Sequence, residues 1–135
     1  MVLFFSIKGK TNPGEGALKI HYSEAPSRRE KAVYERLGES GVIAIRGFRV
    51  PELIASDDTL FALEMTVVKA PFVLDFAASS LDFEPEFSDE IWEEWSRKNE
   101  EQIGADWAMA QAILQELQEL GIYMLDPSPG NIRFR

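Results

Sequence analysis

The hydrophobic pattern of this chain changes its period near residues 69–71, and this change does most to limit the folds open to it. Before this point the apolar residues fall in short runs, the longest of which is 59–68. Such runs are typical of β-strands. After it they recur at helical spacing, and the clearest stripe is Trp107, Ala110, Ile113, Leu114, Leu117 and Leu120. We therefore predict an α+β fold with a β-rich first half and a helical second half.

The boundaries of the individual elements follow from the same pattern. The segment 72–76 fits either a strand or a helical turn, and the predicted strands are residues 2–8, 17–22, 42–45, 52–55 and 59–68. A polar loop, 9–16, joins the first two. We expect residues 1–68 and 69–135 to form two parts of one compact unit, with a hairpin near the C-terminus.

Two serines are placed where helices are predicted to begin. Ser27 is followed three positions later by Glu30, which is the capping-box pattern of a helix N-terminus. Ser88 is a good N-cap for a second helix. A third helix is expected over about 105–120, ending at Gly121.

Composition excludes several classes of protein. The chain has 135 residues, no cysteine and a formal charge of −9. Disulfides and thiolate metal sites are therefore excluded, and the charge argues against general nucleic-acid binding. No apolar run approaches the roughly 20 residues that span a bilayer. We expect a cytoplasmic protein that binds neither nucleic acid nor membrane.

Acidic residues are concentrated in the second half of the chain. Nine of them lie between Asp82 and Glu101, against only Arg97 and Lys98. The simplest interpretation is a solvated helix face with its approach loop. The alternative interpretation is a docking surface for a basic partner.

The segment 126–131, Asp-Pro-Ser-Pro-Gly-Asn, lies between two apolar runs. Its composition alone predicts a tight structural turn. Its Asp126 and Asn131 also have the spacing found in phosphotransferase catalytic loops. There the Asp orients or deprotonates the acceptor hydroxyl and the Asn holds Mg²⁺.

Lys19 and Glu30 form a second candidate pair. Lys19 ends an Ala-Leu-Lys run in a predicted strand, and such a lysine is commonly an edge residue reaching water. The run also looks like the strand whose Lys contacts nucleotide phosphates. Glu30, in the helix that follows, is either half of the capping box or the ion-pair partner of that Lys; it is preferred over Glu35.

Taken in order along the chain, these residues resemble the protein-kinase-like superfamily. The turn is most similar to that of ubiquinone-biosynthesis kinase-like proteins and aminoglycoside phosphotransferases. The resemblance implies that Lys19 contacts the phosphates of ATP, that Glu30 holds Lys19, that Asp126 is catalytic, and that Asn131 binds Mg²⁺ or Mn²⁺. Ser128 departs from the His or Lys usual in that loop.

The same resemblance implies a hinge that contacts the nucleotide. Glu64 and Thr66 lie at the end of the longest apolar run, where the kinase hinge begins. There backbone groups would contact the adenine ring. A buried strand leading to a crossover would have the same sequence.

The Asp-Phe-Gly metal ligand that normally follows the catalytic loop is absent after Asn131. We therefore expect a truncated, pseudokinase-like interaction module that binds nucleotide weakly or not at all, forming a homodimer or binding a protein partner. One alternative is a small ATP phosphotransferase whose missing ligand comes from a partner or another carboxylate, with Asp75 the nearest candidate. The other is an acidic α+β binding domain unrelated to kinases.

Overall fold

The computed structural model describes residues 2–6, 15–125, 127 and 131–135. The described elements combine helices with short strands, which confirms the predicted α+β class. In chain order they are β1 (Val2–Ser6), β2 (Glu15–Ile20), α1 (Glu24–Glu39), β3 (Ala44–Ile45), β4 (Phe48–Arg49), β5 (Leu53–Asp57), β6 (Ala62–Thr66), β7 (Phe72–Val73), β8 (Ser79–Leu81), α2 (Asp89–Ile103), the 3₁₀ turn η1 (Gly104–Asp106), α3 (Trp107–Glu119), β9 (Ile122–Met124) and β10 (Ile132–Arg133).

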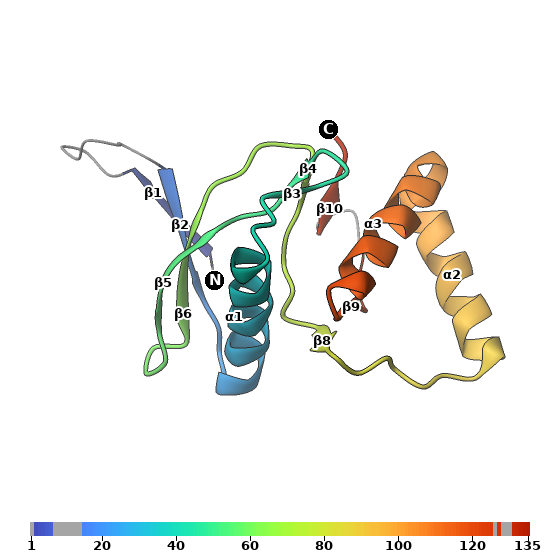
Figure 1. The fold of residues 1–135 in the computed structure, drawn as a ribbon, viewed down its shortest axis with the longest axis horizontal. Helices are drawn as coiled ribbons and strands as arrows, with labels where there is room; N and C mark the ends of the chain where they lie inside the picture. Colours follow the sequence, from blue (N-terminus) through green and yellow to red (C-terminus); the bar gives the residue numbers. More distant parts are fainter. Residues whose placement is uncertain (1, 7–14, 126, 128–130) are drawn as a thin grey trace.

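The largest sheet is antiparallel and has the order β1-β2-β6-β5. Strand β6 pairs with β2 on one side and β5 on the other, and its Ala62, Leu63 and Met65 are buried. Leu63 of β6 is 1% exposed and pairs with Lys19 of β2. Helix α1 lies beside this sheet and separates it from the helical part of the molecule (Figure 1). Two of the candidate site residues lie in these elements: Lys19 in β2 and Glu30 in α1.

Helix α1 begins earlier than the sequence predicts. It starts at Glu24, with Ser23 as the N-cap in extended conformation, and Ser27 is buried inside the helix. The predicted capping role of Ser27 is therefore wrong. Pro26 lies in the first turn, where its missing N–H would have had no helical partner, so it does not prevent the early start. Glu30 therefore lies in the interior of the helix and is not part of a capping box.

The predicted C-terminal hairpin is also wrong, because the two strands flanking residues 126–131 do not pair with each other. β9 pairs with β8, and β10 pairs with β7 in a second sheet of order β10-β7-β4-β3. Val73 and Ile132, paired across β7 and β10, are 0% and 1% exposed. Burying both side chains in the core favours this long-range pairing over a local one.

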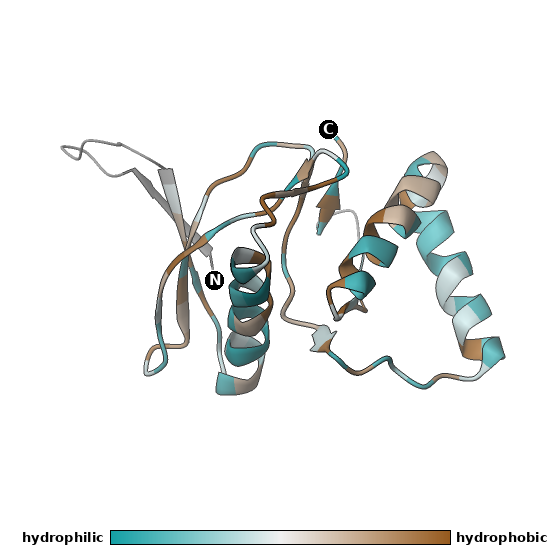
Figure 2. Cartoon of the chain, viewed as in Figure 1, coloured by the Kyte–Doolittle hydropathy of each residue, from teal (hydrophilic) through white to brown (hydrophobic). Residues whose placement is uncertain are grey.

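The two long helices of the second half follow their predicted boundaries closely. The Ser88 hydroxyl accepts a hydrogen bond of 3.3 Å from the Ile91 amide, which confirms the N-cap of α2. Helix α3 buries the predicted stripe from Trp107 to Leu117, with Ile113 and Leu117 at 0% exposure, whereas Leu120, just after the helix, is partly buried. Helix α2 is largely hydrophilic and lies outermost, packed against α3 (Figure 2). In the part of the chain that the structure describes, no helix has the length and apolar character needed to cross a membrane.

One hydrophobic cluster runs through both halves of the chain. It includes Val33 of α1, Leu63 of β6, Phe76, and Ile113 of α3, each at most 1% exposed. The boundary predicted near residue 68 therefore does not coincide with a break in the core. Phe76, which follows β7, belongs to this cluster, and the residue before it, Asp75, is part of the candidate site.

Candidate functional site

The most distinctive polar feature of the interior is an ion cluster around Lys19. Its Nζ atom lies 3.1 Å and 2.9 Å from the two carboxylate oxygens of Glu30, and 2.9 Å from Oδ1 of Asp75. The predicted ion pair between Lys19 and Glu30 is therefore present. Strand β2, helix α1 and the segment after β7 meet at this one ammonium group.

Glu30 is the anchor of this cluster. Its side chain is 1% exposed, so the carboxylate depends on its neighbours for compensation. Burial raises the pKa of Glu30 above its usual range, and the adjacent Lys19 ammonium opposes this effect. Burial lowers the pKa of Lys19, but the attraction of Glu30 and Asp75 outweighs it and leaves that pKa raised. The ammonium of Lys19 and the carboxylate of Glu30 therefore each stabilise the charged form of the other.

Asp75 completes the cluster from an unusual backbone position. Its φ is +70°, a conformation that residues other than glycine seldom adopt, although aspartate tolerates it better than most. Its side chain is 38% exposed, so Asp75 contacts both solvent and the Lys19 ammonium of the buried pair. The next side chain, Phe76, is fully buried and packs edge-to-face on Tyr34 at 5.4 Å. The buried ring fixes the backbone that presents the carboxylate.

The sequence identified Asp75 only as the nearest spare carboxylate and could not place it. One sequence signal could have indicated its position: the apolar run 72–74 is followed by Asp75-Phe76-Ala77. This is close to the Asp-Phe-Gly that ends a strand in kinases and whose Asp binds Mg²⁺. It precedes the 126–131 turn instead of following it, so a search in the usual order does not find it.

Asn131 lies next to this segment. Its backbone oxygen accepts a hydrogen bond of 2.8 Å from the Leu74 amide, and the residue is 9% exposed. The pairing of β7 with β10 thus brings the backbone of Asn131, the predicted metal-binding residue, to Leu74, which directly precedes Asp75. Asp126, the predicted catalytic residue, lies outside the residues that the structure describes.

Glu64 and Thr66 lie in β6, at the end of which the hinge was predicted. The Thr66 amide donates to the Glu52 carbonyl, and the Thr66 hydroxyl accepts from the Glu52 amide, each at 2.9 Å. These two groups are therefore occupied in joining β6 to the segment before β5. Glu64 pairs with Leu18 of β2 and is half-buried. Contact of either residue with a nucleotide stays a prediction.

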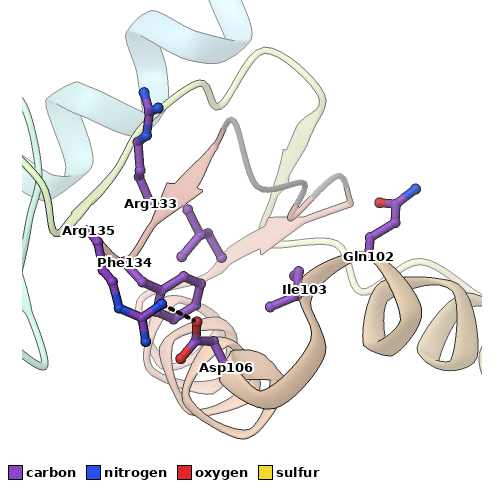
Figure 3. Close-up of a pocket in the computed structure, with 7 residues that line it drawn as sticks. Gln102, Ile103, Asp106, Arg133, Phe134 and Arg135 are labelled. Atoms are coloured by element: carbon purple, nitrogen blue, oxygen red, sulfur yellow. Dashed lines mark ion pairs between the residues drawn. The ribbon is translucent and has the colours of Figure 1, made fainter.

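A surface hollow lies away from this cluster. It has a volume of about 520 Å³ and is lined by residues of the α2–η1 junction and of the last strand. Two of its lining residues, Asp106 of η1 and Arg135, form an ion pair with 3.7 Å between Oδ2 and Nη1 (Figure 3). No ionisable residue of the Lys19 cluster lines this hollow, so its size does not mark it as the chemical site.

His21 lies at the edge of the cluster and is the only histidine of the chain. Its Nε2 atom is 3.3 Å from Oε2 of Glu30, and its side chain is 9% exposed. Burial lowers the pKa of His21 below 6.5, the nearby Lys19 charge lowers it further, and Asp75 acts in the opposite direction. The imidazole is therefore neutral at pH 7.

This lowered pKa makes stability sensitive to mild acid. As pH falls below 6.5, the unfolded chain takes up a proton on His21 that the folded protein does not yet bind. We expect the free energy of unfolding to decrease over this range, and His21→Gln to lose this part of the decrease. Urea unfolding at pH 7 and pH 5.5 measures the difference. Identical pH dependence in the two proteins would contradict it.

Comparisons with known proteins add no family to this geometry. The chain matches no protein-family model, no curated protein and no solved structure. Among the described residues, no group of three or more His, Asp or Glu side chains is arranged to hold a metal ion by itself. Any functional assignment therefore depends on the Lys19 cluster and on its position beside Asn131.

Proposed function

We propose that the protein is a metal-dependent, nucleotide-binding phosphotransferase of the kinase-like type, with the Lys19 cluster at its phosphate end. The observation that carries this proposal is the 2.9 Å contact of Lys19 Nζ with Asp75 Oδ1, formed beside Asn131. Asp75 offers the carboxylate that the sequence lacks after the 126–131 turn. The reason for expecting an inactive module is thereby weakened.

The roles of the residues follow from their charge and exposure. Glu30, fully buried, fixes the position of Lys19, and Lys19 offers its ammonium to nucleotide phosphates. Asp126 would accept the proton of the acceptor hydroxyl. The acceptor oxygen bonds to the γ-phosphorus, the bond from that phosphorus to the β–γ bridging oxygen breaks, and the nucleoside diphosphate leaves.

Asp75 and Asn131 suit a divalent cation that is shared with the nucleotide. Mg²⁺ prefers oxygen ligands and is usually held by one or two protein groups together with substrate phosphates. A partly exposed carboxylate beside an asparagine fits that donor set, and a larger carboxylate group is not required. When bound, the ion would neutralise charge on the transferring phosphate.

Calorimetric titration with ATP, with and without Mg²⁺ or Mn²⁺, tests the proposal. We expect metal-dependent binding to wild type that Lys19→Met abolishes and Asp75→Asn weakens at least tenfold. Asp75→Asn changes a partly exposed side chain and so preserves the fold better than the lysine variant. Lys31→Met is the matched control, because Lys31 lies on α1 in the exposed ion pair with Asp58. Absence of heat at millimolar ATP would falsify nucleotide binding.

Turnover separates an enzyme from a module that only binds nucleotide. We expect slow metal-dependent hydrolysis of ATP that is lost in Asp126→Ala while binding is retained. Binding without any turnover would favour the pseudokinase-like alternative. That alternative is supported by Ser128, which departs from the His or Lys usual in such loops.

A further inference from the structure

Helices α2 and α3 enclose a groove that the proposed function does not use. Its volume is about 340 Å³, and its floor includes Leu114 of α3 and Met124 of β9. Aromatic rings and amide side chains line the walls: Trp92, Trp95, Tyr123, Gln111, Gln115 and Gln118. Helices α2 and α3, which contribute most of the lining residues, lie on the other side of α1 from the first sheet (Figure 1).

The two indole rings in this groove form a corner. Trp92 and Trp95 are 5.4 Å apart with ring planes at 86°, and both are partly exposed. Trp95 is fixed in place, since its Nε1 donates a hydrogen bond of 3.2 Å to the Leu125 carbonyl. Indole faces attract cations, above all the guanidinium of arginine. The corner therefore suits a cationic group better than a neutral one.

The surroundings of the corner are strongly acidic. Pro85, which lines the groove, is flanked by the exposed Glu84 and Glu86. From residue 84 to residue 94 there is no basic residue, and the exposed acids are Glu84, Glu86, Asp89, Glu90, Glu93 and Glu94. A cation entering the groove would be attracted by these charges as well as by the indoles.

Large apolar side chains are exposed among these acids. Phe83 is 78% exposed, Phe87 44% and Ile91 50%. Phe87 also stacks edge-to-face on Trp92 at 5.4 Å, which continues the aromatic surface out of the groove. Apolar and acidic side chains thus alternate along residues 83–94, and a ligand that covered this segment would need both apolar and basic groups.

We propose that this surface, residues 83–95 with the groove, binds a cationic amphipathic segment of a partner protein. Lysine or arginine side chains of the partner would occupy the indole corner, and its apolar side chains would cover Phe87 and Ile91. A second copy of the chain fits poorly, because each copy has a net charge of −9 and would present acid to acid. The proposal does not depend on nucleotide binding.

Tryptophan fluorescence offers a direct test, because all three tryptophans of the chain lie in α2 and α3. The probe is a synthetic helical peptide of lysine and leucine, compared with one in which glutamate replaces every lysine. We expect a saturable change in emission with the basic peptide only, lost in Trp92→Ala and weakened by salt. Asp75→Asn should bind the peptide as wild type does, so failure of either proposal is recognisable.

Matched charge variants separate a local site from general attraction. Glu84→Gln/Glu86→Gln removes charge beside the groove, and Glu100→Gln/Glu101→Gln removes the same charge at the other end of α2. We expect about a fivefold weaker Kd for the first and less than about a twofold change for the second. Equal weakening of both, no saturation below about 200 µM peptide, or a dimer in sedimentation that excludes the peptide would each overturn the proposal.

Discussion

Lys19→Met is expected to lower the free energy of unfolding by about 3 kcal/mol, because it leaves the Glu30 carboxylate buried without its partner. The remaining Asp75 carboxylate does not compensate, since it has the same sign of charge. The Lys19 side chain is 16% exposed, so we expect a loss at the lower end of the range for breaking a buried ion pair. Urea denaturation at pH 7 measures the effect.

A compensating variant shows whether the loss comes from the uncompensated charge. Lys19→Met/Glu30→Met removes both members of the pair and fills the space with apolar groups, so we expect it to recover most of the stability. Lys31→Met serves again as control and should change stability by less than about 1 kcal/mol. A double variant less stable than Lys19→Met would mean that the ion pair contributes more than mutual charge compensation, contrary to this prediction.

Phe76→Ala is expected to cost about 3–5 kcal/mol, the range for removing a fully buried aromatic side chain. The ring packs edge-to-face on Tyr34, and its loss leaves a cavity directly behind Asp75. Since Asp75 is held at a positive φ by its surroundings, we also expect metal-dependent nucleotide binding to be lost. Thermal unfolding and the ATP titration together measure both consequences.

Phe134→Ala is the matched control for this prediction. Phe134 likewise packs edge-to-face on another aromatic ring, that of Phe48, at 5.1 Å, but it is only partly buried. We expect a cost of about 1–2 kcal/mol and no effect on nucleotide binding. Phe76→Leu retains most of the volume and should keep the fold while altering the position of Asp75. Unchanged ATP affinity in that variant would indicate that Phe76 has no positioning role.

The sequence predicted the elements that depend on local information. The α3 stripe and the Ser88 N-cap follow from periodicity or from one side chain, and the structure confirms them. The strand predicted over 59–68 is present but shorter, as β6 (Ala62–Thr66). The start of α1 was wrong because two serines could each serve as N-cap. The helix begins after Ser23 because Ser27 and Glu30 are both buried in its interior, against the rest of the fold.

Strand pairing could not be predicted in the same way. β7 and β10 each contain two residues, and nothing in so short a run specifies a partner. The pairing is decided by burial of Val73 and Ile132 in the common core, which is a property of the whole fold. The ion pair of Lys19 with Glu30 was predicted from the resemblance to kinase-like proteins, whereas the place of Asp75 next to the β7–β10 pairing depends on this long-range contact and was not predicted.

The strand pairs of the second half are nested, and this arrangement has a consequence for folding kinetics. Helices α2 and α3 lie inside the chain loop closed by β8 and β9, and that loop lies inside the one closed by β7 and β10. Closing the inner pair first shortens the effective loop for the outer pair and lowers its entropic cost. We therefore expect Asn131 to reach Asp75 late, so that most of the molecule is folded before its candidate site is assembled.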